Sequence, residues 1–539
     1  MLDTLDAPAV RTWCRLALAA LGQAREEIDA LNVYPVPDGD TGTNLYLTVE
    51  SAAEALDAVF AAAEEPELAV AAAAAARGAL IGARGNSGVI LAQWLRGLAE
   101  VLADGGELAA ALDHGARSAY RAVAVPVEGT LLTVAAAAAK AADAADAADG
   151  LTGQAREAYR AARQALLLTP GQLSALAEAG VVDAGGRGLV AVLGALVDAV
   201  SGQQPMGPVA LRRDADRGAP VAGCESHERP PGSGHPAFEV IYLLEAGDEQ
   251  LPLLRERLGR LGDSLVIGGG DGLWNVHVHV DDAGAAVEAG VEAGRPHRIR
   301  ITHFAEAAAR SGEREETVSH GRAVLSVVTG SGLAQLCEQA GSVVLAADPD
   351  RPPASAELVA AVHRCGAREV VLLLNDPELR PAAGAAADQL REEGVRIAVL
   401  PTRSPVQGLA ALAVHDAGRR FDEDVVAMTS AAGATRYAEL AVAEGESWTM
   451  AGVCQAGDVL GLIDGDVAVI GTDLTETALT VLDRMIAAGG ELVTLVLGEE
   501  APDGLADRLI AHARRTRPEV DTVAYRGGRE AAPLLIGVE

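Results

Sequence analysis

Residues 1–201 carry a helical pattern almost without interruption, and this pattern limits what the first part of the chain can fold into. Alanine and leucine dominate, β-branched runs are short, and apolar residues recur every three or four positions, as they do in amphipathic helices. The tract AAAAAKAADAADAADG at residues 135–150 places acids at every third position and is typical of a solvated helix face. We therefore predict an all-helical N-terminal domain.

The segment NVYPVPDGDTGTN at residues 32–44 interrupts this pattern. Its two prolines and two glycines indicate a shaped turn. Asp38 and Asp40 lie one residue apart, so a turn can point both carboxylates at one hard cation. Mg²⁺ takes one or two protein carboxylates and leaves its other positions to water and substrate phosphates. The alternative is an acidic surface turn with no ligand.

Two further glycine-rich loops precede helical patterns. GARGNSG at residues 82–88 runs into VILAQWLRGLAEVL, and VDAGGRGL spans residues 182–189. Asn86 and Ser87 therefore lie at or near a helix N-terminus, where unpaired N–H groups and the helix dipole favour an anion such as phosphate. An ordinary Asn/Ser cap is the alternative. Three such loops in one helical region favour a nucleotide site.

These loops and PVEGTLLTV at residues 126–134 resemble, in order and spacing, the ATP-binding domain of the dihydroxyacetone kinase L-subunit (DhaL) family. The chain is most similar to the fatty acid kinase A family, over essentially its whole length. The resemblance implies an antiparallel helical barrel that holds ATP at one end, with Mg²⁺ on Asp38 and Asp40. The implied nucleotide-binding residues are Asn32, Asp38, Asp40, Thr43, Asn44, Gly85, Asn86, Ser87, Thr130, Asp183, Gly185, Gly186 and Arg187.

The net charge excludes some classes of partner, and the scarcity of lysine limits how the chain can bind phosphate. The formal net charge is −33, so we expect neither nucleic acid nor an anionic membrane surface as a partner. Lys140 is the only lysine, and no GxxxxGK[ST] motif occurs, so the chain is not a P-loop nucleotidase. Metal, backbone amides and arginine must therefore handle any phosphate.

Compartment signals favour the cytoplasm. The five cysteines are scattered without a CxxC pair, which fits a reducing environment. The N-terminus MLDTLD carries acids where a signal peptide needs bases. The longest apolar tract is interrupted by Arg77 and Arg84, so we expect no transmembrane segment.

The pattern changes after residue 201. Residues 202–235 are rich in proline and glycine and indicate a linker, in which Cys224, His227 and His235 are possible metal ligands. Residues 236–320 predict a small βαββαβ sandwich. His277 and His279 in WNVHVHVD share one strand face, so they are candidates to contact a metal or the transferred phosphoryl group. The alternative is two polar residues on a solvent face.

The resemblance adds a zinc question to this middle domain. In the family, the two histidines bind zinc together with a cysteine on the preceding strand, and Ala237 stands at that position here. A zinc site with two protein ligands is poor, so we expect little tightly bound zinc unless a linker residue supplies a third ligand. His277 and His279 remain the catalytic candidates near the phosphoryl group.

Residues 321–539 begin with strand–helix alternation that predicts a parallel α/β sheet, followed by strands of more antiparallel style. This part resembles the family's DegV-like C-terminal domain, with matching pieces at residues 399–412 and in the closing LLIGVE. The family's GGQTMNPS segment is replaced here by residues 346–355. The role that this segment has in the family is therefore not assigned to residues 346–355.

The resemblance implies an ATP-dependent kinase that phosphorylates a fatty acid carboxylate to give an acyl phosphate. A separate DegV-like fatty-acid-binding protein would present the substrate, and we expect a homodimer. One alternative is a dihydroxyacetone (glycerone) kinase, although nothing here resembles that family's substrate domain. Another is a non-enzymatic ATP- or lipid-binding regulator, which the intact DGDTGTN argues against.

Overall fold

The computed structural model describes residues 5–63, 65–145, 150–201, 236–304, 321–349, 351–528 and 532–539. The chain divides into two compact units, Met1–Gly312 and Glu313–Glu539. The predicted linker at residues 202–235, with Cys224, His227 and His235, lies outside the described residues.

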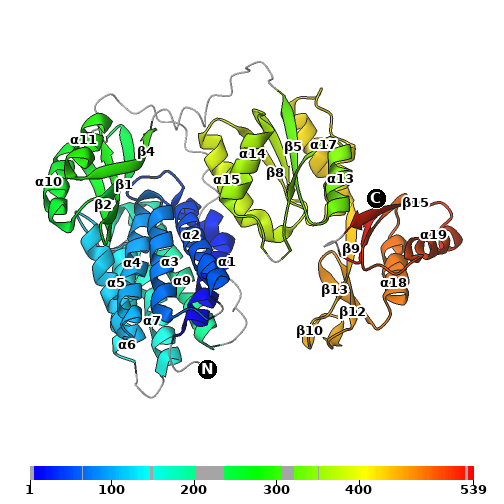
Figure 1. Ribbon diagram of the computed structural model, residues 1–539, viewed down its shortest axis with the longest axis horizontal. Coiled ribbons are helices and arrows are strands. Elements are labelled where there is room, and N and C mark those ends of the chain that lie inside the picture. The colour runs from blue at the N-terminus through cyan, green and yellow to red at the C-terminus, as the bar shows by residue number, and fades with distance from the viewer. Residues whose placement is uncertain are drawn as a thin grey trace. The chain divides into compact units, whose positions relative to one another are not determined.

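The first part of unit 1 is helical, as the periodicity predicts. Consecutive long helices pack side by side, and α9 returns against α1 to close a barrel (Figure 1). Close packing needs small residues: a Cβ on Gly97 would lie 2.7 Å from the Cα of Gly115 on the next helix. The helices are α1 (Ala7–Leu31), α2 (Thr41–Ala62), α3 (Leu68–Gly82), α4 (Gly85–Ala103), α5 (Leu108–Ala122), α6 (Leu131–Asp143), α7 (Gly150–Leu168), η2 (Thr169–Gly171), α8 (Ser174–Ala179) and α9 (Ala184–Ser201).

The up-and-down course of these helices gathers the N-termini of α2, α4, α6 and α9 at one end of the barrel, which we call the site end. None of the four carries an acidic residue in its first turn, so an acid that offsets one of these dipoles must come from outside that turn. Helix α9 is long and apolar enough to cross a membrane by length and composition alone. Within the structure, 72% of that stretch is buried, as in the core helix of a packed domain.

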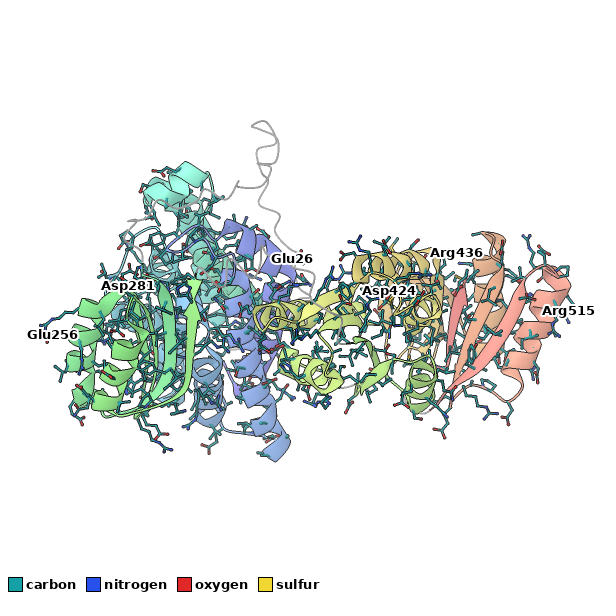
Figure 2. The ribbon with its side chains drawn as sticks, turned by 90° about the horizontal axis from the view of Figure 1, so that it is seen from above. Glu26, Glu256, Asp281, Asp424, Arg436 and Arg515 are labelled. Atoms are coloured by element: carbon teal, nitrogen blue, oxygen red, sulfur yellow. The ribbon has the colours of Figure 1, made fainter. Side chains whose placement is uncertain are left out.

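The second part of unit 1 has the predicted βαββαβ order. Its antiparallel sheet runs β2-β3-β1-β4, and α10 and α11 cover one face, where Val240, Val276 and Val278 form the core. Figure 2 shows Glu256 on α10 pointing away from this core. The elements are β1 (Phe238–Glu245), η3 (Asp248–Gln250), α10 (Leu251–Leu261), β2 (Gly262–Gly270), β3 (Leu273–Val280), α11 (Ala283–Ala293) and β4 (Arg295–His303).

The middle domain docks on the helical barrel through polar and apolar contacts. Asn275 Nδ2 donates to the carbonyl of Leu80 at 3.2 Å, and Arg255 Nη1 donates to the carbonyl of Ala122 at 3.1 Å. Val266 of β2 is buried in a cluster formed mostly by barrel residues. This docking turns the uncovered face of the sheet towards the barrel.

Unit 2 combines a parallel sheet, β6-β5-β7-β8, with a mixed six-stranded sheet, β13-β12-β9-β16-β14-β15, and a β10-β11 hairpin. The α/β class and the change to antiparallel pairing agree with the sequence. The elements are β5 (Arg322–Val328), α13 (Ser331–Gln339), β6 (Val343–Ala346), α14 (Ser355–Cys365), β7 (Glu369–Leu373), η4 (Pro377–Leu379), α15 (Arg380–Glu392), β8 (Arg396–Leu400), α16 (Pro405–Ala413), α17 (Phe421–Ala434), β9 (Arg436–Val442), β10 (Ser447–Thr449), β11 (Gly452–Cys454), β12 (Val459–Ile463), β13 (Asp466–Gly471), α18 (Leu474–Ala487), β14 (Leu492–Gly498), α19 (Leu505–Thr516), β15 (Asp521–Gly528) and β16 (Leu534–Val538).

A buried ion network ties the parallel sheet of unit 2 to α17. Asp424, labelled in Figure 2, is fully buried and lies 3.0 Å from Arg322 Nη1 and 2.7 Å from His415 Nδ1. The divergent segment at residues 346–355, of which residue 350 is not described, connects the edge strand β6 to α14 in the sequence.

Candidate active site

The DGD turn lies at the site end, between α1 and α2. Asn32 ends α1 and donates through Nδ2 to Asp38 Oδ1. Asn44, in the first turn of α2, hydrogen-bonds the carboxylate of Asp40. Burial, and then the neighbouring Asp38 carboxylate, raise the pKa of Asp40 well above its ordinary value. A divalent cation between the two carboxylates would remove this repulsion.

Asp40 occupies the N-cap position of α2, yet its side chain makes no capping bond. Asp29 of α1 supplies the cap instead, since Asp29 Oδ1 accepts from the amides of Gly42 at 2.6 Å and Thr43 at 3.0 Å. The Thr43 hydroxyl donates to Asp29 Oδ2 and accepts from Arg25. The structure thus places Thr43 in a capping network and leaves Asp40 available for a ligand. Sequence reasoning missed Asp29, which carries no motif signal.

The start of α4 has the features that an anion site needs. Arg84 at its N-cap makes no side-chain capping bond, and Asn86 Oδ1 is buried with no hydrogen-bond partner among the described residues. Gly85 has φ +57°, and a Cβ there would overlap Asn44, so this glycine brings α4 against the DGD turn. Ser87 follows in the same turn. First-turn amides without a side-chain acceptor suit phosphate oxygens.

Asp183 joins the starts of α6 and α9. Its Oδ2 accepts from the amide of Gly186 at 2.6 Å, and its carboxylate also bonds the amide of Leu131. Burial raises the pKa of Asp183 to about 6. Burial, and then Asp183, raise the pKa of the Tyr34 hydroxyl, so the DGD segment lies close to this cap. The Thr130 hydroxyl donates to the carbonyl of Val127 at 2.8 Å.

The remaining VDAGGRG residues hold the barrel together. Arg187 makes a two-pronged ion pair with Glu27 of α1, with both N···O distances at 3.1 Å. A Cβ on Gly186 would lie 2.8 Å from Val134, and one on Gly185 would lie 3.3 Å from Leu131. The structure therefore shows these three residues in helix packing at the site end. Their contact with a nucleotide stays a prediction.

His277 and His279 point from β3 towards the barrel and are both buried. Their Nε2 atoms lie 3.0 Å apart, and Glu239 Oε1 on β1 lies 3.6 Å from His277 Nε2. The donor atoms of these three residues all lie within 4.8 Å of one another, as a shared metal ion requires. Asp263 on β2 approaches the far side of His279, with Oδ1 3.9 Å from Nδ1.

This donor set fits zinc better than the sequence suggested. Burial, and then His279, lower the pKa of His277 well below its ordinary value; burial also lowers the pKa of His279, against the opposing charges of Asp263 and Asp38. Two neutral imidazoles and one carboxylate form a three-ligand set of the catalytic type.

The premise that only two side chains meet here is therefore wrong, because Glu239 lies two residues beyond Ala237 on the same strand face. Ala237 itself makes backbone hydrogen bonds: its amide donates to Asp281, which is labelled in Figure 2, and its carbonyl accepts from the amide of Phe304. His277 Nδ1 is buried without a partner among the described residues, so the bond that usually orients a metal-bound imidazole is not seen. Zinc occupancy stays a prediction.

The histidine cluster and the DGD turn belong to one site. Burial is the main cause of the raised pKa of Asp40, and Glu239 adds to it across the joint between the two domains. In the same way, the negative charge of Asp38 acts to raise the pKa of His279, against the larger effect of burial. These interactions place the β3 histidines and the DGD carboxylates close enough for their charges to couple.

Comparisons with known proteins find relatives of similar length. Protein YloV of Bacillus subtilis (strain 168) is 28% identical over 565 residues, covering 100% of both chains. An uncharacterized protein of Staphylococcus haemolyticus is 28% identical over 95% of both chains. Among solved structures, a DegV family protein from Corynebacterium glutamicum matches 40% of this chain and 97% of its own, with 15% identity and a TM-score of 0.31.

Three family models match successive parts of the chain. A DAK2 domain matches residues 35–198, and the middle and C-terminal domains of FakA-like proteins, which are relatives of fatty acid kinase A, match residues 235–311 and 323–539. Together these three matches assign the chain to the FakA-like family. In this family member, the DGD turn lies in the DAK2 match and the paired histidines lie in the middle-domain match.

Proposed function

We propose that this FakA-like protein is an ATP-dependent kinase that transfers phosphate to the carboxylate of a fatty acid. The observation that supports this most is the meeting of two clusters. The paired carboxylates Asp38 and Asp40, at the site end of the barrel, lie within electrostatic reach of the Glu239–His277–His279 cluster.

The barrel residues would bind the nucleotide. Asp38 and Asp40 would hold Mg²⁺, which when bound neutralises charge on the phosphates. The uncapped first turn of α4 and the unpartnered Oδ1 of Asn86 would hold the phosphate tail. Asn32 and Asn44 would orient the two carboxylates, since each hydrogen-bonds one of them.

A carboxylate acceptor suits the histidines of this site. Its oxygen attacks the γ-phosphorus, the bond to the β,γ-bridging oxygen breaks, and ADP leaves. Since RCOO⁻ and ATP⁴⁻ become the acyl phosphate dianion and ADP³⁻, no proton has to be removed. His277 and His279, whose pKa values are lowered mainly by burial, are weak bases, and a hydroxyl acceptor would need a stronger one.

The fatty acid would arrive on a separate binding protein of the DegV type. A free fatty acid is an anion, and a chain of net charge −33 repels it, although salt screens charges beyond ~8 Å. A partner that encloses the acyl chain and offers its carboxylate would overcome this repulsion. We therefore expect slow ATP consumption with free oleate and faster consumption with an oleate-loaded DegV-family protein.

The test compares wild type with Asp40→Asn in that assay, with the acyl phosphate trapped as a hydroxamate. Asp40→Asn should reduce turnover below detection because the cation site loses a ligand, while the Tm stays equal or rises because repulsion with Asp38 is relieved. Asp248→Asn, on the exposed turn η3, is the matched control. Normal turnover by Asp40→Asn at equal Tm would refute the site, and efficient phosphorylation of dihydroxyacetone without a partner would favour the glycerone kinase alternative.

A further inference from the structure

We propose that Arg300 on β4 binds the incoming acceptor carboxylate, and that the substrate enters over the β4 edge of the middle sheet. The inference rests on the proposed function for the identity of the acceptor. It assigns a substrate-binding role to a residue outside the motifs that the sequence singled out.

Strand register places Arg300 on the same sheet face as the histidine cluster. Ile241 of β1 pairs directly with His277 on one side and with Arg300 on the other. Directly paired residues of antiparallel strands project their side chains to the same face. Glu239 likewise pairs with both His279 and Thr302. Arg300 is therefore two strands, roughly 10 Å, from His277, a span that a long side chain largely covers.

The contact between His279 and Phe304 supports this assignment of faces. Their ring centroids lie 4.9 Å apart in an edge-to-face arrangement, so the residue four positions after Arg300 also projects to the cluster's side. On the opposite face, Phe238 packs against His303 at 4.7 Å. Consecutive side chains at the end of β4 therefore project to opposite faces of the sheet. Continuing this alternation back along the strand puts Arg300 on the same face as the histidine cluster.

Charge makes β4 the favourable side for an anion. Strand β4, RPHRIRITH, contains three arginines, two histidines and no acid. The opposite edge of the cluster carries Asp263, whose side chain is 57% exposed. In a chain of net charge −33, this contrast directs a carboxylate to β4 and away from β2.

Arg300 is also an arginine whose side chain is not engaged by an acid of the protein. Arg25 and Arg187 of the barrel are engaged by Asp29 and Glu27, and Arg295 on β4 lies 3.7 Å from Glu245. The exposed side chain of Arg300 has no ion pair or hydrogen bond among the described residues. A guanidinium offers a carboxylate two parallel donors, so Arg300 can hold one substrate oxygen while the other attacks the γ-phosphorus.

The first experiment measures transfer from an oleate-loaded DegV-family protein. Arg300→Ala should lower kcat/KM for the loaded protein roughly tenfold or more, since a charge-assisted contact is lost, and Arg300→Lys should recover part of the loss. MgAMP-PNP affinity should stay unchanged in both variants. Arg295→Ala removes the same charge at the far end of β4 and is the control. Transfer by Arg300→Ala within about twofold of wild type would overturn the inference.

The second experiment does not depend on turnover. Wild-type protein with MgAMP-PNP is treated with phenylglyoxal, and arginine modification is mapped by mass spectrometry with and without octanoate. Octanoate should protect Arg300 and leave Arg295 reactive. Equal modification of Arg300 in both samples would overturn the inference whatever the turnover. Protection in a protein that makes no acyl phosphate would instead refute the proposed function and keep the carboxylate site.

Discussion

At the scale of single residues, the motifs located the groups that lie on one short segment. Asp38, Asp40, His277 and His279 could be found because each pair is close in sequence. Asp29, Glu239 and Arg300 could not, because their importance arises when α1 meets α2 or when neighbouring strands pair. Asp183 was found, but in the structure it caps two helices.

The buried cap of Asp183 predicts a pH dependence of stability. Its folded pKa of about 6 lies above the unfolded value near 3.8. Protonated Asp183 therefore contributes to the stability of the fold at pH values below its unfolded pKa. This contribution, about 3 kcal/mol in full, is lost as the pH rises through the folded pKa of about 6. Asp183→Asn keeps an acceptor for Gly186 and cannot ionise. Between pH 4 and pH 7, without nucleotide, the Tm of the variant minus that of wild type should increase; a constant difference would contradict this reasoning.

At the scale of elements, helical and strand periodicity was sufficient to predict an all-helical N-terminal domain and the βαββαβ order of the middle domain, whereas the barrel arrangement was implied by the family resemblance. Periodicity could not show which helix starts are capped, because Asp29 acts on α2 from another helix. It also could not show that glycines in the loops serve close packing, as Gly186 does against Val134. The DGD turn and α4 are brought together by such a glycine, Gly85.

Gly85→Ala tests that element contact. Gly85 has φ +57° and its Cβ position overlaps Asn44, which hydrogen-bonds Asp40. Gly180 has φ +66° with nothing within 4 Å of its Cβ position, so Gly180→Ala is a control for backbone strain alone. Both variants should lose about 1–2 kcal/mol of stability. Only Gly85→Ala should weaken MgAMP-PNP binding in calorimetry, and equal affinities in the two variants would show that Asn44 does not depend on this contact.

At the scale of the molecule, the composition changes near residue 201 and after residue 320 indicated separate parts, but not how they join. The site of unit 1 is built across the joint between barrel and middle domain, which involves side chains such as Asn275 and Arg255 bonded to backbone carbonyls. Contacts of this kind leave no pattern in a sequence, so the coupling of His279 to Asp38 could not be predicted.

Arg255→Ala tests whether this joint aligns the reaction. Arg255 bonds the carbonyls of Ala122 and Ile267 at 3.1 Å and 2.9 Å, linking α10 to the barrel. Its loss should lower phosphoryl transfer about tenfold, because misplacement of reacting groups is costly, while MgAMP-PNP affinity is kept. Arg257→Ala, two residues away on α10 and paired with the exposed Glu292, is the control. Equal transfer rates in both variants would mean that the joint is not needed for alignment.

The placement of the single lysine has a chemical consequence for the proposed reaction, whose product is an acyl phosphate. An acyl phosphate is a reactive acyl donor that modifies amines and thiolates. Lys140 lies in the last turn of α6, roughly 14 Å along the helix from its start at the site end. Burial raises the pKa of Cys14 to about 12 and that of Cys337 to about 11, so these thiols stay protonated. An acyl phosphate formed at the site would therefore lie far from the amine of Lys140 and would meet no thiolate of Cys14, which would limit acylation of these two side chains.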